Sequence, residues 1–227
     1  ISSVEIDTYL AETAAALTVE HPDYSYLAAR IKVNSLHKET PGFIIATKNL
    51  YDDGLLREEY FKKVMENADA IESIIDYDKD YTFDYFALTT LIRAYLLKFD
   101  NRTIERPQDL WMRVTLTVTG NEFNLDKIKE TYKSLSSGMY THATPTLFNS
   151  GLKMQQLSSC FLIGMEDDSI EGIFNTIKDC ALISKTAGGI GMHAHNIRGS
   201  GSRIKSTNGK SNGLIPFLKI FNETAKS

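Results

Sequence analysis

The fold is decided by residues 160–197, which read CFLIGMEDDSIEGIFNTIKDCALISKTAGGIGMHAHNI. The apolar run at 160–165 predicts a buried strand, and apolar residues recur at helical spacing through residues 169–186. A second strand is expected over residues 190–197, and a helix over residues 213–226. Because strands and helices alternate in this order, the segment predicts a βαβα unit with parallel strands.

Both ends of the central helix carry residues that are typical of helix caps. Asp168 is expected to be the N-cap, with Glu171 as its partner in the first turn. Gly188 lies where a C-terminal cap belongs. The sequence therefore predicts the bounds of this helix as well as its type.

The chain upstream of this unit has the spacing of helices rather than strands. Helices are expected over residues 8–18 and 24–37, and again over 83–97, 108–118 and 125–136. The first pair is too short to fold alone. The predicted fold class is therefore α followed by α/β. The last helix reaches residue 227 without a stop signal, so we expect a piece of a longer protein.

Composition limits the compartment and the partners. The 227 residues are 42% hydrophobic and 24% charged, with a formal net charge of -4 and two cysteines. Interspersed acids and bases argue against a groove for a nucleic acid polymer. No window approaches the ~20 apolar residues of a membrane span, and no export signal is present. We expect a cytoplasmic protein that binds no membrane, in which any disulfide is transient and catalytic.

Cysteine chemistry has two readings here. Cys160 follows two serines and precedes an apolar strand, so its thiol could face a polar ligand and donate electrons. A free cysteine is more often a small buried hydrophobe, and this reading stays open for Cys160. Cys180 lies within the predicted helix near its apolar face, where we expect it to be part of the core and not paired with Cys160.

Charged residues around the same unit suggest phosphate and ribose recognition. Asp168 could accept a sugar hydroxyl as well as cap the helix, while Lys185, Arg198 and the loop 199–213 offer cations and backbone N–H groups. A cap and a solvated loop are the simpler alternatives. His193 and His195 alternate on the predicted strand and face the same way, but no third ligand is suitably spaced. We therefore expect no metal site.

Four motifs carry a specific resemblance. They are THATPTLFNSG at 141–151, LSSCFL at 157–162, EDDSIEG at 166–172 and KTAGGIG at 185–191. In order and spacing they resemble the large, catalytic subunit of class I ribonucleotide reductase, closest to the eukaryotic type, and the likeness covers residues 4–227. It implies the C-terminal part of an ATP-cone at 1–40, a helical domain at 41–150, and the first βαβα part of a ten-stranded α/β barrel at 151–227.

The resemblance also implies roles for individual residues. Cys160 is similar to the cysteine that reduces the ribose 2′ position and pairs with a cysteine outside this chain. The residues implied to hold the substrate are Thr144, Ser159 and Gly189. The residues implied to form the effector specificity site at a dimer interface are Asp168, Ser169, Ile170, Lys185, Arg198, Lys205 and Ser206. The residues implied to sense ATP against dATP are Ser3, Asp7 and Lys38.

The implied reaction is the reduction of ribonucleoside diphosphates to deoxyribonucleoside diphosphates by thiyl-radical chemistry, for DNA precursor synthesis. Its implied effectors are ATP, dATP, dTTP or dGTP with Mg²⁺. The implied partners are a metal-containing small subunit that supplies the radical, further copies of the large subunit, and thioredoxin or glutaredoxin as reductant. The residues that carry the radical in this family lie outside the 227, so the isolated chain is expected to be inactive.

Two readings from other functional classes remain open at this point. The chain could be a stand-alone nucleotide-sensing module that uses Asp168 and Arg198 without catalysis. It could also be a helical scaffold in which Cys160 belongs to the core and the glycine-rich loop is a linker. Nucleotide binding would distinguish the sensing module from the scaffold. A cysteine beyond residue 227 would distinguish the reductase from both.

Overall fold

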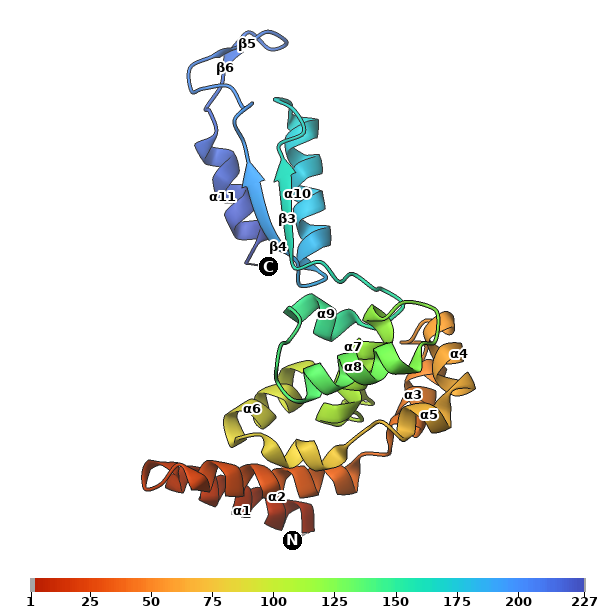
Figure 1. The fold of residues 1–227 in the computed structure, drawn as a ribbon. Helices are drawn as coiled ribbons and strands as arrows, with labels where there is room; N and C mark the ends of the chain where they lie inside the picture. Colours follow the sequence, from red (N-terminus) through yellow and green to blue (C-terminus); the bar gives the residue numbers. More distant parts are fainter. Residues whose placement is uncertain (1–2, 227) are drawn as a thin grey trace. The chain divides into compact units, whose positions relative to one another are not determined.

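The computed structural model describes residues 3–226, so residues 1, 2 and 227 of the predicted domain ranges lie outside it. The chain divides into two compact units, one ending at Gln155 and the other beginning at Gln156 (Figure 1). The predicted cone segment and helical domain lie within the first unit. The boundary falls five residues after the predicted one at 150. Within the described residues, no helix has both the length and the apolar character needed to cross a bilayer.

The first unit is built almost entirely from helices. Its α-helices are α1 (Ser3–Ala16), α2 (Asp23–Glu39), α3 (Phe43–Asp52), α4 (Glu58–Glu66), α5 (Ala68–Glu72), α6 (Tyr85–Thr90), α7 (Pro107–Val118), α8 (Leu125–Ser136) and α9 (Thr144–Asn149). Its shorter elements are η1 (Leu17–Val19), η2 (Tyr77–Thr82), η3 (Leu91–Tyr95), β1 (Lys98–Phe99) and β2 (Arg102–Thr103). Helices α1 and α2 pack side by side, as Figure 1 shows.

Helix α7 is the centre of this unit. The ten residues from Pro107 to Leu116 are all buried, including polar ones. Pro107 occupies the first turn, where its missing N–H costs nothing, and the Asp109 carboxylate accepts a hydrogen bond from the backbone N–H of Arg106 at 2.8 Å. The predicted helix at 108–118 is thus confirmed. Its burial on all sides explains why its polar residues need internal partners.

The predicted helix at 83–97 is only partly correct. Helix α6 begins after Asp84, whose carboxylate accepts a hydrogen bond from Ala87 N–H at 2.7 Å, and the chain continues as the π-helical turn η3. A two-stranded hairpin then follows, because β1 and β2 pair antiparallel around Asp100 and Asn101. Those two residues have φ of 49° and 61°, as this tight turn requires.

The second unit confirms the predicted βαβα order. It contains β3 (Cys160–Gly164), α10 (Ile170–Ser184), β4 (Gly189–His193), β5 (Arg203–Ile204), β6 (Gly209–Lys210) and α11 (Ile215–Thr224). Strands β3 and β4 are parallel, with Cys160 opposite Gly189 and Gly164 opposite His193. The second strand is shorter than predicted, because a turn joins Ala194 to Ile197 and ends the sheet. The predicted glycine-rich loop contains the hairpin β5–β6.

The β3–β4 pair has two unlike faces. Met192 on β4 packs against the buried cluster that contains Ile173 and Ile177 of α10, and Phe217 and Phe221 of α11 pack against the same cluster. The alternate positions on the opposite face are exposed, and they are Cys160, Leu162, Gly164, Gly189, Gly191 and His193. Side chains alternate along a strand, so the face that carries Cys160 is the one that α10 and α11 leave uncovered.

Both predicted caps of α10 are wrong. The N-cap is Ser169, whose hydroxyl accepts a hydrogen bond from Gly172 N–H at 3.0 Å, so Glu171 is not a capping partner either. At the other end Ala187, not Gly188, has the left-handed φ of 62°. Gly188 is needed for space instead, because a Cβ there would lie 2.7 Å from Ile183 Cγ2 and 2.9 Å from Phe161 Cε2.

Candidate functional site

Cys160 lies at the exposed start of β3, with Ser159 and Gly189 beside it. Gly189 pairs with Cys160 across the sheet, and its N–H donates to the Ser159 carbonyl at 2.7 Å. A Cβ on Gly189 would lie 3.9 Å from the Cys160 sulfur. The structure thus brings three of the predicted catalytic and substrate residues together. The small residue at 189 also leaves space beside the thiol.

The two cysteines have different surroundings. Both thiols are free, and Cys160 is exposed whereas Cys180 is half-buried in α10. Burial and the nearby Asp179 carboxylate raise the pKa of Cys180. The thiolate is the reactive form of cysteine, so the raised pKa lowers the reactivity of Cys180 at neutral pH.

A pocket of about 670 Å³ lies between the N-terminus of α10, the β5–β6 hairpin and α11. We call it the Asp168–Arg198 pocket. Its lining residues are Asp168, Ser169, Ile170, Ile173, Arg198, Ser202, Arg203, Ile204, Lys205, Ser206, Ser211 and Phe217. Six of the seven residues predicted for the effector site are among them. Pockets of 300–1,000 Å³ are typical of small-molecule sites.

An ion pair joins Asp168, which precedes α10, to Arg198, which precedes the β5–β6 hairpin. Arg198 Nε donates to the Asp168 carboxylate at 2.5 Å, and Arg198 Nη2 donates to the Asp168 carbonyl at 3.1 Å. This pairing is why Asp168 does not cap α10, since its carboxylate is turned to the guanidinium. Both side chains are about one-third exposed, at 29% and 34%. They therefore remain accessible to a ligand in the pocket.

The pocket wall opposite α10 is the hairpin that sequence reasoning treated as a loop. Lys205 and Ser206 lie in its turn, between β5 and β6, and both are exposed. Arg203 on β5 adds a further cation that was not predicted. Its position within the basic stretch 198–210 is the feature of the sequence that could have indicated this role. Ile173 and Phe217 add an apolar wall, and nothing in their spacing distinguished them from ordinary core residues.

Lys185 is the predicted effector residue that the pocket does not include. It lies just after α10, at the end of the helix opposite Asp168. Its backbone N–H donates to the Ala181 carbonyl, which is the last hydrogen bond of the helix type. Helix α10 has 15 residues, which at ~1.5 Å per residue makes it roughly 22 Å long. A lysine side chain cannot return over that distance, so Lys185 does not reach the pocket of its own chain.

The residues predicted for ATP and dATP sensing are near one another on α1 and α2. Lys38 Nζ donates to the Asp7 carboxylate at 3.0 Å. Ser3 precedes Asp7 by four residues on α1, which places both on the same side of the helix. The structure therefore brings Asp7 and Lys38 into contact and places Ser3 one helical turn away.

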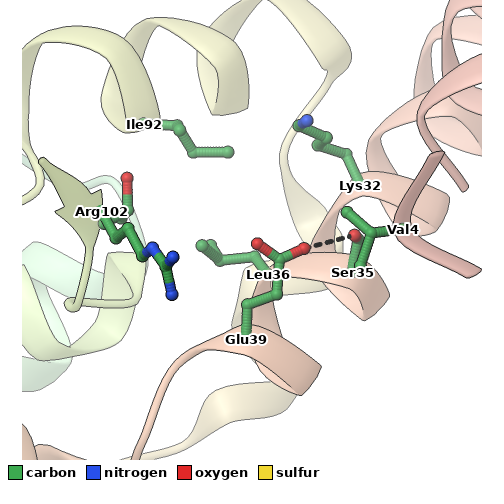
Figure 2. A pocket seen from close by; sticks show the side chains of 8 residues that line it. Val4, Lys32, Ser35, Leu36, Glu39, Ile92 and Arg102 are labelled. Carbon is green, nitrogen blue, oxygen red and sulfur yellow. Dashed lines mark hydrogen bonds between the residues drawn. The ribbon is translucent and has the colours of Figure 1, made fainter. Parts of the chain in front are cut away.

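A different hollow of about 500 Å³ opens between α1, α2, η3 and β2 (Figure 2). Figure 2 shows Lys32, Leu36 and Glu39 of α2 on one side and Ile92 and Arg102 on the other. Ser35 donates to the Glu39 carboxylate at 3.0 Å. Neither Asp7 nor Lys38 lines this hollow, so it is separate from the predicted nucleotide-sensing residues.

Thr144 belongs to the first unit, where it begins α9. Its hydroxyl lies 3.2 Å from the hydroxyl of Tyr95. Arg113 binds the C-terminal end of α9, because its guanidinium donates to the carbonyls of Leu147 and Ser150 at 3.2 and 2.8 Å. A buried arginine of α7 thus fixes the short helix that presents Thr144.

The two histidines of the second unit do not form a metal centre in this structure. The rings of His193 and His195 stack with centroids 4.8 Å apart, and their Nδ1 atoms are 2.8 Å apart. No third histidine, cysteine or carboxylate joins them to make a metal-binding group in residues 3–226. Gly164 makes room for this stack, because a Cβ there would lie 2.7 Å from His193 Nε2.

Comparison with known proteins finds the same family along the whole chain. The family model of the ribonucleotide reductase all-alpha domain matches residues 81–155, and that of the ribonucleotide reductase barrel domain matches residues 158–227. The ribonucleoside-diphosphate reductase large chain 2 of Saccharomyces cerevisiae is 48% identical over 236 aligned residues, which cover 100% of this chain and 27% of the relative.

Further relatives come from plants and viruses. The ribonucleoside-diphosphate reductase large subunit of Arabidopsis thaliana is 47% identical, with 100% of this chain and 29% of the relative covered. The corresponding subunit of Variola virus is 46% identical, with 100% and 30% covered. The chain therefore spans less than a third of the length of the curated relatives it matches.

Proposed function

This chain belongs to the ribonucleotide reductase large-subunit family, and from that membership we propose that it forms part of an enzyme that reduces ribonucleoside diphosphates to deoxyribonucleoside diphosphates. In this proposal Cys160 is one thiol of the reducing pair. The second thiol, the thiyl-radical cysteine and the assisting glutamate come from residues outside these 227. The 227 residues alone are then inactive as a reductase.

The observation that carries the proposal is the position of Cys160. Its thiol lies on the uncovered face of β3, beside Gly189 and the Ser159 carbonyl, where a ribose ring could approach without meeting a side chain at 189. Oxidation of this thiol and of its distant partner to a disulfide releases two electrons and two protons. Those electrons reduce the ribose 2′ carbon, and the 2′ hydroxyl leaves as water. Ser159, Gly189 and Thr144 are proposed to hold the substrate diphosphate and its neighbouring atoms.

Effector nucleotides are proposed for the Asp168–Arg198 pocket. A triphosphate is a good partner for Arg198, Arg203 and Lys205, since charge-assisted hydrogen bonds to cations are among the strongest polar contacts. The Asp168 carboxylate, which pairs with Arg198 and is 29% exposed, is proposed to accept a ribose hydroxyl as well, and Ser169 lines the pocket beside it. The proposed ligands are ATP, dATP, dTTP or dGTP, each with Mg²⁺. Ser3, Asp7 and Lys38 are proposed to belong to a second nucleotide site that distinguishes ATP from dATP.

The position of Lys185 supports a dimer in this scheme. It cannot reach the pocket of its own chain, so we assign it to the pocket of a second copy, which puts the effector site at a subunit interface. The other proposed partners are a metal-containing small subunit that supplies the radical, and thioredoxin or glutaredoxin that reduces the spent disulfide. The proposed place of action is the cytoplasm.

The test is a mass measurement on the protein as cells make it, alkylated before and after reduction, with peptide mapping of Cys160. The proposal predicts a mass far above 25.5 kDa, and a disulfide from Cys160 to a distant cysteine that thioredoxin opens. A full-length protein in which Cys160 remains a free thiol after turnover would refute its redox role.

A second function is favoured by the pocket alone. The Asp168–Arg198 pocket lies entirely within the second unit, so this unit could bind effector nucleotides without any catalytic residue. In that case the natural protein would have a mass near 25.5 kDa, bind nucleotides and keep Cys160 reduced. The same mass measurement separates this regulatory module from the reductase.

A further inference from the structure

Tyr95 lies against the proposed substrate residue Thr144, and none of the roles above uses it. Tyr95 is the last residue of the π-helical turn η3, and its hydroxyl is 3.2 Å from the Thr144 hydroxyl. Both residues are half-buried. Short π-helical segments are frequent at functional sites. The contact puts a phenol next to the hydroxyl that is proposed to meet the substrate diphosphate.

The position of Tyr95 relative to α9 is fixed by packing and by a buried ion pair. The ring of Tyr95 packs against that of Phe148 in α9, with the centroids 4.9 Å apart. Two residues further along, the N–H of Leu97 donates to the Glu105 carboxylate at 2.9 Å. Glu105 pairs with Arg113, whose guanidinium binds the C-terminal end of α9. The segment that carries Tyr95 and the helix that begins with Thr144 are therefore anchored to the same ion pair.

The chemistry of a phosphate decides the direction of the hydrogen bond between the two hydroxyls. A hydroxyl group donates one hydrogen and also accepts. A deprotonated phosphate oxygen only accepts, so Thr144 has to donate its hydrogen to the phosphate. The Thr144 oxygen is then free to accept from Tyr95, 3.2 Å away. With a pKa of about 10, a phenol is more acidic than an aliphatic hydroxyl and is the better donor of the two.

We propose that Tyr95 is a positioning residue for the substrate diphosphate, because its hydroxyl donates to Thr144 Oγ1 and turns the Thr144 O–H toward a phosphate oxygen. This inference rests on the proposed function, in which Thr144 holds the substrate. Successive hydrogen bonds polarise one another, so the bond from Tyr95 also makes Thr144 a stronger donor. Neither hydroxyl acts on the ribose. The loss of Tyr95 should therefore lower substrate affinity and leave the chemical step unchanged.

The test measures KM and kcat for CDP with the full-length reductase and its small subunit. Tyr95→Phe keeps the ring that packs on Phe148 and removes only the hydroxyl. It should raise KM about three- to tenfold, the range expected for one hydrogen bond, with kcat nearly unchanged. Thr144→Val should raise KM by at least about tenfold, because the bond that it removes goes to a charged group. Thr144→Ser keeps the hydroxyl and should keep the KM of the unaltered enzyme.

A double variant tests whether Tyr95 acts through Thr144. In the Thr144→Val background, Tyr95→Phe should raise KM no further, because the two residues act as one unit. Tyr81→Phe is the matched control. It removes a tyrosine hydroxyl that donates to Asn34 at 2.8 Å elsewhere in the same unit, so its KM should equal that of the unaltered enzyme.

The contrary results separate this inference from the proposed function. If Thr144→Val raises KM and Tyr95→Phe does not, the positioning role of Tyr95 is overturned while the proposed function stands. If neither variant raises KM, Thr144 does not hold the diphosphate, and its proposed role falls together with the inference. The inference is also overturned if Tyr95→Phe raises KM equally with and without Thr144, or if Tyr81→Phe raises it as much.

Discussion

Replacing Arg113 tests how the core of the first unit supports α9, the helix that begins with Thr144. Arg113 is 2% exposed at its side chain, and its Nε lies 2.5 Å from the Glu105 carboxylate, which is 3% exposed. The same guanidinium donates to Leu147 and Ser150, at the end of the helix that begins with Thr144. Arg113→Met keeps much of the volume and removes every one of these bonds.

The size of the effect follows from the charge that is left behind. Without Arg113, the Glu105 carboxylate keeps the hydrogen bond from the Leu97 N–H, at 2.9 Å, but has lost the cation that balanced its charge in this buried site. Breaking a buried pair in this way costs about 3–5 kcal/mol. Domains are typically stable by about 5–15 kcal/mol. The variant should therefore lose a large part of the unit's stability, and α9 should open first.

Urea unfolding followed by tryptophan fluorescence measures this loss, since the single Trp111 lies in α7. The double variant Arg113→Met with Glu105→Gln leaves no buried charge, so it should be more stable than Arg113→Met alone. Lys62→Met is the control. It breaks only the exposed pair of Lys62 with Glu58, so this variant should unfold like the unaltered chain. A loss below about 1 kcal/mol in Arg113→Met, or no recovery in the double variant, would contradict the reasoning.

Three further predictions concern other parts of the chain. Iodoacetamide should label Cys160 faster than Cys180, because Cys180 is less exposed and its pKa is raised. Mass spectrometry of peptides taken over time measures both rates, and equal rates would contradict this prediction. Gly188→Ala should destabilise the second unit by about 1–3 kcal/mol in thermal unfolding, because its Cβ would clash with Ile183 and Phe161, and an unchanged midpoint would argue against that packing. Burial raises the pKa of Asp109 to about 8, above its unfolded value, so its stabilisation should be present below about pH 4 and lost as the pH rises through 8. Urea midpoints across this range should fall less steeply in Asp109→Asn, and parallel profiles would exclude Asp109 as the cause.

The sequence predicted the order of elements better than their ends. Apolar spacing located α7, α8 and the βαβα unit, because one-sided burial leaves a regular pattern. The caps of α10 were misassigned since Asp168 is a good N-cap residue by type, but Arg198, thirty residues away, takes its carboxylate. The β1–β2 hairpin was missed because its turn, Asp100 and Asn101, lacks the glycine that usually marks it.

The candidate sites divide in the same way. Motif resemblance supplied Cys160, Ser159 and Gly189, and the parallel register then placed them side by side. It also supplied six residues of the Asp168–Arg198 pocket. The apolar wall of that pocket, Ile173 and Phe217, could not be foreseen, because core and ligand-facing apolar residues have the same spacing.

The most direct test of the account is equilibrium binding of dTTP with Mg²⁺ to the chain, compared with Arg198→Gln and with Lys178→Gln, an exposed position of α10 outside the pocket. We expect saturable binding that falls at least about tenfold in Arg198→Gln, where a charge-assisted contact is lost, and that does not change in Lys178→Gln. Binding that is absent from all three, or equally strong in the Arg198 variant, would contradict the assignment of this pocket to an effector nucleotide.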